Sequence, residues 1–313
     1  MLIKPFFEQS PEPHIEALAL GFFDGVHRGH RYLFRKLLEI STPERSGVAT
    51  FEPHPLRVIA PEHEPPLLMT LPQKIQAIQN CGVPNVFIWG FDEDIRNLSP
   101  DLFAKHLRFL FPSLRQLVVG ENWRFGFQAS GTPAHLSAFG QNYGWKVHVI
   151  PPICDENGLR ISSSLIRKLI KEGRILEAEK LLGDSWRVTG RVVKGAGIGR
   201  QIGFPTANLE LDRSILWPPD GVYAGVAECK AKRHLVVINV GYRPTVSKNK
   251  QHTLEVHLIN YEGGDLYGEI LELSGWIRLR AEQQFASLEA LQAQIKEDIA
   301  RACSLKERDK WNV

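Results

Sequence analysis

The spacing of hydrophobic and polar positions changes about halfway along the chain. In the first 150 residues, short apolar runs alternate with segments whose apolar side chains recur at helical spacing. The apolar runs occupy residues 17–20, 48–51, 86–89, 117–119 and 147–150, and the helical segments occupy residues 32–40, 73–80, 100–109 and 135–142. This alternation predicts an α/β unit with a parallel sheet, whose ligands bind beyond the carboxyl ends of the strands.

After residue 183 the pattern becomes that of strands. Two short helices, expected at 163–172 and 175–182, lead out of the α/β part. The β-type runs that follow occupy residues 187–193, 222–227, 235–240, 253–259 and 269–273. Many strands with little helix predict an antiparallel barrel or sandwich, on which a last helix at 288–303 should dock its apolar stripe. We therefore expect two domains, residues 1–183 and 184–313.

Composition agrees with two domains and excludes several classes of protein. The 313 residues are 43% hydrophobic and 23% charged, which excludes a disordered, collagenous or coiled-coil protein. The formal net charge of +3 demands neither a nucleic-acid nor a membrane partner. We expect a cytoplasmic protein, because the chain shows no membrane span, no secretory signal and no CxxC pair among its four cysteines.

A histidine-containing turn lies between the first strand and the first helix. Residues 21–30 read GFFDGVHRGH, in which Gly25 and Gly29 let the backbone approach a ligand closely. The helix N-terminus offers N–H groups to an anion, and His27 and His30 add donors, which together suit a triphosphate. The alternatives are a turn stabilised by the helix dipole alone or a pair of metal-binding histidines. The strand–turn–helix context favours the phosphate.

A second candidate phosphate site is the segment 194–208, KGAGIGRQIGFPTAN. It does not form a dinucleotide-binding fingerprint, because its glycines give GxGxxxG and Pro205 forbids the helix that should follow. The glycines still supply backbone N–H groups for phosphates. Thr206 and Asn208 share a face of an extended stretch, where their oxygens could hold Mg²⁺ with a nucleotide. The alternative is a hydrogen-bonded strand edge without a ligand.

Two other polar positions have both a chemical and a plain structural interpretation. Glu255 lies in the middle of a predicted strand and could accept a proton from a hydroxyl group, or it could belong to the polar outer face of that strand. The serines at 162–164 stand at a helix N-terminus, with Arg167 one turn further on. They could bind phosphate, or they could form a simple N-cap beside a surface arginine.

The first half resembles the nucleotidyltransferase superfamily, specifically the bacterial bifunctional riboflavin kinase/FAD synthetase family. The resemblance rests on GFFDGVHRGH, TFEPHP at 50–55, VGENWRFG at 119–126 and ISSSLIR at 161–167. It implies a Rossmann-like adenylyltransferase domain in which His27 and His30 contact ATP phosphates and Asp24 helps to place the nucleotide or a metal. Further residues are assigned to ATP or phosphate binding, namely Gly21, Phe23, Gly29, Ser163, Ser164 and Arg167, and to flavin binding, namely Asn122 and Arg124.

Two positions depart from the pattern of this family. Asn122-Trp123 stands where the family commonly has an acidic residue followed by phenylalanine, and Ser164 stands where it usually has threonine. Serine keeps the hydroxyl group. Asparagine removes a charge and could weaken metal or flavin-phosphate contacts, so the first domain could be degenerate.

The second half resembles the riboflavin kinase part of the same family. Beside the glycine segment and PTAN, the matching stretches are PDGVYA at 219–224, NVGYRPT at 239–245, LEVH at 254–257, DLYG at 265–268 and an R-x-E-x-x-F pattern from Arg280. The resemblance implies a Greek-key barrel with a terminal helix, Glu255 as general base, and Thr206 and Asn208 at Mg²⁺. Phosphate binding is assigned to Gly195, Gly197, Gly199 and Gly203, and flavin binding to Arg280 and Glu282.

The resemblance implies that the protein makes flavin cofactors. It would phosphorylate riboflavin with ATP to FMN and then adenylylate FMN with a second ATP to FAD and pyrophosphate. Both steps would use Mg²⁺, and the partners would be these small molecules, without nucleic acid or membrane. One alternative is a riboflavin kinase alone, and another is a flavin- or RNA-binding regulator built on inactive domains. The presence of His27, His30 and Thr206 disfavours the regulator.

Overall fold

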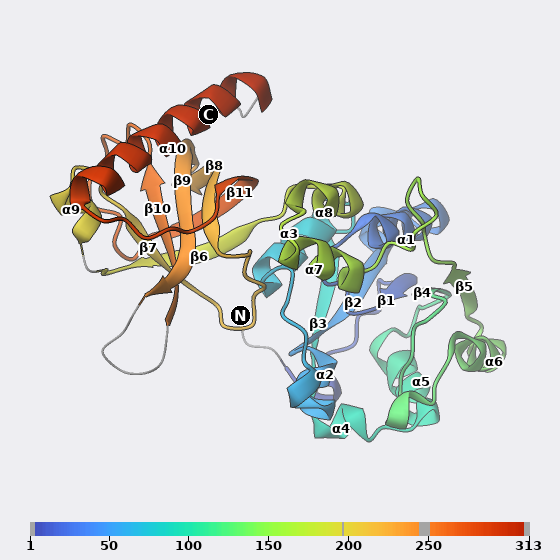
Figure 1. The fold of residues 1–313 in the computed structure, drawn as a ribbon. Helices are drawn as coiled ribbons and strands as arrows, with labels where there is room; N and C mark the ends of the chain where they lie inside the picture. Colours follow the sequence, from blue (N-terminus) through green and yellow to red (C-terminus); the bar gives the residue numbers. More distant parts are fainter. Residues whose placement is uncertain (1–3, 196, 244–250, 310–313) are drawn as a thin grey trace. The chain divides into compact units, whose positions relative to one another are not determined.

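The computed structural model describes residues 4–195, 197–243 and 251–309, which fall into two compact units (Figure 1). The first unit comprises the residues up to 67 together with 71–163, and the second comprises 68–70 together with the residues from 164 onward. Pro244 and Thr245 of the NVGYRPT stretch lie outside the described residues. Each unit is built around a sheet of its own.

The first unit contains a five-stranded parallel sheet with the order β3-β2-β1-β4-β5. Its strands are β1 (Ala17–Leu20), β2 (Ser46–Glu52), β3 (Asn85–Gly90), β4 (Gln116–Gly120) and β5 (Lys146–Ile150). The chain moves outward from β1 in both directions. The loops after β1 and β4 therefore diverge at the position where open parallel sheets bind ligands. The predicted doubly wound parallel sheet is confirmed.

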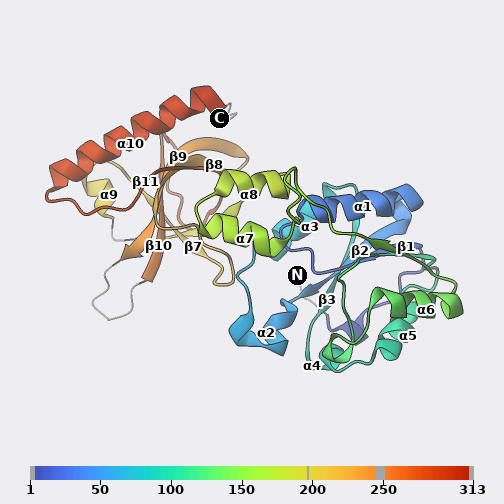
Figure 2. The ribbon, with the colours of Figure 1, turned by 45° about the vertical axis from the view of Figure 1, so that its right-hand side comes forward.

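Helices cover both faces of this sheet (Figures 1 and 2). On one face lie α1 (Arg28–Ile40) and α3 (Leu71–Gln79), and on the other lie α5 (Pro100–Leu110) and α6 (Pro133–Tyr143). The shorter helices α2 (Pro55–Ile59) and α4 (Glu93–Arg96) follow β2 and β3. All four residues of β1 are buried. The histidine turn therefore begins directly from the middle of the core.

The first helix begins earlier than the hydrophobic pattern predicts. Apolar spacing indicates a helix from residue 32, whereas α1 begins at Arg28, and His27 is its N-cap. The reason is that the first turn of α1 contains only polar residues and glycine, so it adds nothing to the apolar periodicity. The last residues of the histidine motif, Gly29 and His30, thus lie in the first turn of the helix, while residues 21–27 precede it.

The second unit contains a closed antiparallel barrel with the order β10-β7-β6-β11-β8-β9. Its strands are β6 (Val188–Val193), β7 (Ala207–Leu211), β8 (Gly221–Cys229), β9 (Lys232–Arg243), β10 (Gln251–Leu258) and β11 (Ile270–Arg280). The pairs β6–β11 and β7–β10 join strands far apart in the sequence, as in a Greek key. The predicted barrel is confirmed, while β7 was expected only as an extended stretch.

Three helices of the second unit pack near the barrel or lead into it. The long terminal helix α10 (Leu288–Asp309) lies on β8 and β9, where Ala302 joins a cluster with Val222, Ala224 and Leu235. The helices α7 (Ser163–Lys171) and α8 (Ile175–Leu182) precede the barrel, and α8 contacts β11. Compactness groups α7 and α8 with the barrel. The domain limits 1–183 and 184–313 were drawn from the sequence pattern and not from compactness, and they stay a prediction.

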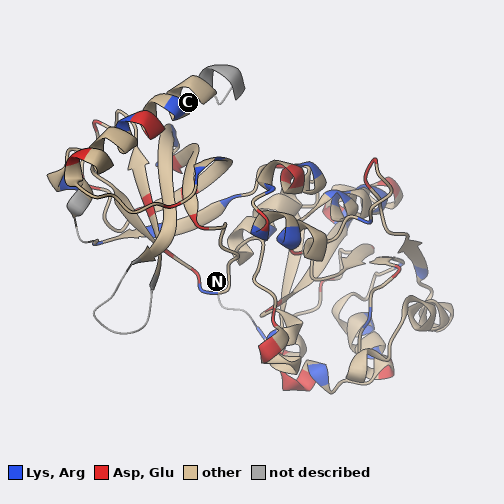
Figure 3. Cartoon of the chain, viewed as in Figure 1, with Lys and Arg blue, Asp and Glu red and all other residues tan. Residues whose placement is uncertain are grey.

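Two further features of the described residues are the character of the helices and the distribution of charged side chains. Within residues 4–195, 197–243 and 251–309, no helix has both the length and the apolar character that crossing a bilayer requires. Lysine and arginine are interspersed with aspartate and glutamate along both units (Figure 3).

Two tryptophans fix the start of the barrel. Trp186 donates its Nε1–H to the Leu68 carbonyl at 3.1 Å and packs against Trp276.

Candidate active sites

The histidine turn of the first unit is a buried structure between β1 and α1. Asp24 and His27 are 2% and 6% exposed. The Nδ1 atom of His27 accepts the backbone N–H of His30 at 3.4 Å and so caps α1. The two imidazole rings stack with their centroids 3.6 Å apart. The structure therefore brings Asp24, His27 and His30 together at a helix N-terminus, where an anion is favoured.

The imidazole of His30 is held in its neutral form. Its Nδ1 atom is buried and has no hydrogen-bond partner among the described residues, although the residue as a whole is partly exposed. Burial lowers the pKa of His30 well below its usual value, and the charges of His27 and Lys74 lower it further. At neutral pH His30 can donate a hydrogen bond to a phosphate but adds no positive charge.

The start of the turn is fixed by a close contact between a glycine and an aromatic ring. Phe23 is buried with a φ of 58°, and a Cβ atom on Gly21 would come within 2.6 Å of its ring. The Phe23 ring also meets the edges of His30 and Phe34. Gly21 is thus required by packing against Phe23, which holds His30 from behind. Gly29 stands in the first turn of α1, next to the His27 ring.

The serine segment reaches the same turn through one hydrogen bond. The Ser163 hydroxyl donates to the Asp24 carbonyl at 2.9 Å. Ser164 and the buried Arg167 lie on α7, which belongs to the second unit apart from its first residue. The predicted contact of Ser164 and Arg167 with ATP phosphates stays a prediction.

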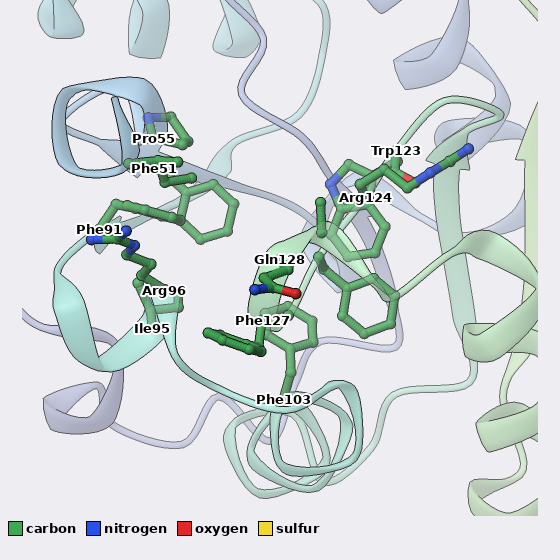
Figure 4. Close-up of a pocket in the computed structure, with 14 residues that line it drawn as sticks. Phe51, Pro55, Phe91, Ile95, Arg96, Phe103, Trp123, Arg124, Phe127 and Gln128 are labelled. Carbon is green, nitrogen blue, oxygen red and sulfur yellow. The ribbon is translucent and has the colours of Figure 1, made fainter. Parts of the chain in front are cut away.

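An aromatic cavity of about 550 Å³ lies at the carboxyl end of β2. Figure 4 shows Phe51, Pro55 and Phe91 on one side of it and Trp123 and Arg124 on another. The rings of Trp123 and Phe125 stack with centroids 4.7 Å apart, and Phe125 packs in turn on Phe103. The remaining lining residues are Ile59, Ile95, Arg96, Gly126, Phe127, Gln128 and Ala129. A flat aromatic ligand fits such a cavity.

The two flavin-binding residues predicted in the first unit differ in their placement. Arg124 lines the aromatic cavity, and its Nη1 donates to the carbonyls of Glu121 and Trp123. Asn122 is exposed and is not among the lining residues. With its amide oxygen turned toward Arg160, Asn122 accepts hydrogen bonds from that guanidinium. This position, one of the two at which the chain departs from the family it resembles, thus faces a positive charge.

The barrel brings its three predicted polar residues together on the outward face of β7 and β10. Glu255 of β10 pairs in register with Asn208 of β7. The Thr206 hydroxyl donates to Glu255 Oε2 at 3.3 Å. The alternate residues Leu254 and Val256 are buried and face the core. A carboxylate, a hydroxyl and an amide therefore converge at one point of a rigid strand pair.

The glycine segment lies against these side chains. A Cβ atom on Gly195 would fall 2.1 Å from the Asn208 Nδ2 atom, so a larger residue there would displace the Asn208 amide. Gly199 lies in the short helix α9 (Ile198–Gln201), where its Cβ position is 3.1 Å from the Thr206 hydroxyl. Gly197 and Gly203 flank this helix with φ values of 72° and 85°. Of the four predicted glycines, Gly195 and Gly199 thus lie next to Asn208 and Thr206, whereas Gly197 and Gly203 provide the turns on either side of α9.

A cleft of about 440 Å³ opens beside Thr206. Arg200 and Pro205 line it from the glycine segment. Tyr261, Asp265 and Tyr267 line it from the loop between β10 and β11, and sequence reasoning did not select them as binding residues. The available signal was the loop composition, in which glycines stand beside tyrosines and an aspartate at 261–268. The cleft adjoins the point where Thr206 and Glu255 meet.

Arg280 and Glu282, predicted to bind flavin, lie at the end of β11. Arg280 donates to both carboxylate oxygens of Asp298 on α10, through Nε at 3.1 Å and Nη2 at 2.9 Å. The Glu282 carboxylate lies against Gly241, where a Cβ atom would collide with it. The guanidinium of Arg280 is therefore already neutralised, and its contact with flavin stays a prediction.

The two candidate sites, one on the parallel sheet and one on the barrel, fit a transferase that acts on phosphate-bearing substrates. A family model described as FAD synthetase matches residues 9–165, and one described as riboflavin kinase matches residues 182–305. The chain belongs to the bifunctional riboflavin kinase/FMN adenylyltransferase family and contains both of its domains. The expectation of two catalytic domains is supported over that of a kinase alone.

Three known proteins illustrate the extent of this similarity. The bifunctional riboflavin kinase/FMN adenylyltransferase of Escherichia coli (strain K12) is 39% identical over 289 residues, which cover 90% of each chain. The protein of the same description from Pseudomonas fluorescens is 35% identical over 97% of each chain. A crystal structure described as a macrolide-efflux protein from Streptococcus pneumoniae matches with a TM-score of 0.82 and 28% identity, over 96% of this chain and 98% of that chain. The last comparison shows that a known structure shares the fold of this chain.

Proposed function

We propose that this protein converts riboflavin to FMN at the barrel and FMN to FAD at the parallel sheet. Each reaction consumes one ATP, and the second releases pyrophosphate. The observation that carries the proposal is the convergence of Glu255 with Thr206 and Asn208, which the sequence selected in two distant segments, beside a nucleotide-sized cleft. The family supplies the identity of the substrates.

At the barrel, Glu255 acts as the general base. As the ribityl 5′-oxygen of riboflavin attacks the γ-phosphorus of ATP, its proton passes to the Glu255 carboxylate, and the bond from the γ-phosphorus to the bridging oxygen of ADP breaks. The Thr206 hydroxyl, which donates to Oε2, holds this carboxylate in place. Backbone N–H groups of the glycine segment bind the phosphates.

Mg²⁺ fits the residues that face the glycine segment. Hydroxyl and amide oxygens are hard donors, and Thr206 and Asn208 present both types side by side with room for phosphate oxygens. The described part of the chain contains no group of three or more His, Cys, Asp or Glu side chains that could hold a metal. The ion, when bound, neutralises the charge of clustered phosphates. Thr206 and Asn208 would therefore share it with ATP.

At the parallel sheet, the aromatic cavity binds the isoalloxazine ring of FMN. The ring stacks among Phe51, Phe91 and Trp123, which leaves the FMN phosphate free to meet ATP at the histidine turn. An FMN phosphate oxygen attacks the α-phosphorus of ATP, and pyrophosphate leaves. His27 and His30 donate hydrogen bonds to the phosphate oxygens, with His30 as a neutral imidazole.

We place the protein in the cytoplasm, with ATP and flavins as its partners. The four cysteines are free thiols, which suits a reducing compartment. Its substrates are also small metabolites that need no membrane-bound or nucleic-acid partner.

The test is to incubate the full chain with riboflavin, ATP and Mg²⁺ and to separate FMN from FAD by chromatography. We expect FMN to form first and FAD to follow, and supplied FMN to give FAD and pyrophosphate. Accumulation of FMN without FAD would restrict the function to the kinase. Absence of both products would refute the proposal.

A further inference from the structure

Lys74, on α3, is a buried lysine for which the two reactions as described above have no role. The residue is 2% exposed, and its Nζ atom has no hydrogen-bond partner among the described residues. Burying an ammonium group without such partners is unfavourable, because the protein interior solvates charge poorly. Lys74 thus lowers the stability of the first unit, a cost that a role for its charge in the reaction would explain.

The surroundings of Lys74 connect the two halves of the adenylyl-transfer site. Its Nζ atom lies 3.9 Å from the centre of the Phe22 ring, and the same ring meets His54 in a T-shaped arrangement with centroids 4.4 Å apart. Phe22 belongs to the histidine turn. His54 precedes Pro55, which lines the aromatic cavity. The ammonium group therefore contacts Phe22 of the histidine turn, and Phe22 contacts His54, the neighbour of a residue that lines the aromatic cavity.

The charges that face Lys74 come from both of these segments. Asp24 of the turn and Glu52 at the end of β2 attract its ammonium group, while His30 of α1 lies within range of its field. Burial lowers the pKa of Lys74 to about 8, and the two carboxylates oppose that shift. At neutral pH the side chain therefore stays mostly protonated, and its charge has no hydrogen-bond partner among the described residues.

We propose that Lys74 is a positioning residue for adenylyl transfer, a buried cation that holds Phe22, Asp24 and Glu52 in place where the FMN phosphate approaches ATP. The inference rests on the proposed function of the first unit. Two anionic groups must meet there, and a fixed positive charge beneath the site reduces their repulsion without reorganising during the reaction. Lys74 acts through Phe22 and the carboxylates and does not touch the reacting atoms.

The alternative is that Lys74 only stabilises the fold, and the two roles predict opposite combinations of stability and activity. Lys74→Met keeps the length of the side chain and removes the charge. A positioning role predicts a variant at least as stable as the wild type but slower in making FAD. A purely structural role predicts a less stable variant whose folded fraction retains its rate.

The experiment measures kcat and KM for FMN and ATP in FAD synthesis, together with urea unfolding, for Lys74→Met and Lys74→Arg. Lys105→Met, an exposed lysine on α5, is the matched control. We expect Lys74→Met to lose about tenfold or more in kcat/KM for FMN, less than the loss of a direct donor, without losing stability. Lys74→Arg should recover part of this rate, and riboflavin phosphorylation should be unchanged throughout.

Two results would overturn the inference. One is a Lys74→Met variant that makes FAD within about twofold of the wild-type rate. The other is a pair of folded variants, Lys74→Met and Lys74→Arg, that are equally impaired, because charge would then not be the relevant property. Failure of the wild-type chain to make FAD would instead refute the proposed function of the first unit.

Discussion

Arg280 and Asp298 form a two-pronged ion pair that joins the last strand of the barrel to the terminal helix. The guanidinium reaches both oxygens of a carboxylate that is only 4% exposed, while the Arg280 side chain is 18% exposed. The Arg301 guanidinium adds a second link between the same elements by donating to the Leu279 carbonyl at 2.8 Å. The position of α10 on the barrel thus depends on a charge pair beside an apolar cluster.

We expect Asp298→Asn to destabilise the second unit by about 2–4 kcal/mol, because it leaves the largely buried Arg280 guanidinium without its counter-charge. Urea unfolding followed by tryptophan fluorescence measures this, since Trp276 lies in the barrel. The neighbouring exposed Glu297 provides the control substitution Glu297→Gln. Equal stabilities of the two variants would show that the pair adds little.

Glu255→Gln is expected to lower FMN formation by about 10²–10⁴-fold, because the amide keeps the shape of the side chain but accepts no proton. Binding of riboflavin and ATP should change little. Glu210→Gln, on the exposed side of the adjoining β7, is the matched control and should leave the rate unchanged. FAD formation from supplied FMN reports that the chain is folded. A rate for Glu255→Gln within a few-fold of wild type would remove Glu255 from the mechanism.

His30→Ala should abolish FAD formation while FMN formation continues. The cap of α1 survives this change, because His27 accepts the backbone N–H of residue 30 and not its side chain. The loss therefore reports the missing hydrogen-bond donor and not a misfolded helix. His63→Ala, an exposed histidine of the same unit, is the control. An equal loss of both products would mean that the variant is unfolded or that the two centres are not independent.

Asn122→Asp restores the carboxylate that the family commonly has at this position. Because Asn122 faces the Arg160 guanidinium, the new aspartate should pair with it, at a gain of at most about 1 kcal/mol since both residues are exposed. We expect kinase activity to be unchanged and FAD formation to increase. Initial rates with supplied FMN check this prediction. An unchanged rate would show that asparagine serves equally well there.

The lowered pKa of Lys74 predicts how the free energy of unfolding depends on pH. Its pKa is about 8 in the folded chain against an ordinary value of 10.5. Below pH 8 the lysine is charged in both folded and unfolded states, so the native state carries the full cost of burying the charge. Between about pH 8 and 10.5 the folded state has released the proton and the unfolded state has not, so this cost falls.

The stabilisation of Lys74→Met relative to wild type should therefore be larger at about pH 7 than at about pH 10. The expected difference is about 2–3 kcal/mol. Urea unfolding of both proteins at the two pH values provides the comparison, and taking the difference between them cancels the titration of other groups. A difference that does not depend on pH would mean that the lysine has an ordinary pKa.

The spacing of hydrophobic and polar residues was enough to predict the architecture, because this spacing reflects which side chains are buried. Every run of apolar residues expected as a strand in the first half is a strand of the parallel sheet, and the change after residue 183 marks the barrel. The start of α1 was misplaced by four residues, since its polar first turn gives no periodic signal. The strand β7 was only expected to be extended, because it is short and begins two residues after Pro205.

The candidate sites were predictable where a motif is local and not where a site is assembled from distant segments. His27 and His30 lie within one turn of chain, and Thr206, Asn208 and Glu255 were selected by motif. The aromatic cavity draws on segments around residues 51, 91 and 123, and no local pattern shows that these rings meet. Lys74 reads in the sequence as an ordinary polar position of a helix, and only its burial distinguishes it.

The closure of the barrel bears on how this protein behaves at high concentration. Every barrel strand has a neighbour on both sides, so the described barrel backbone offers no free row of N–H and C=O groups to a strand from another molecule. The parallel sheet does have edges. At β3 one end is covered, where Gly90 bridges to Pro5, whereas β5 pairs only with β4 among the strands that the structure describes. Association by strand addition should therefore begin at β5, so the first unit sets how concentrated a stock can be kept before it precipitates.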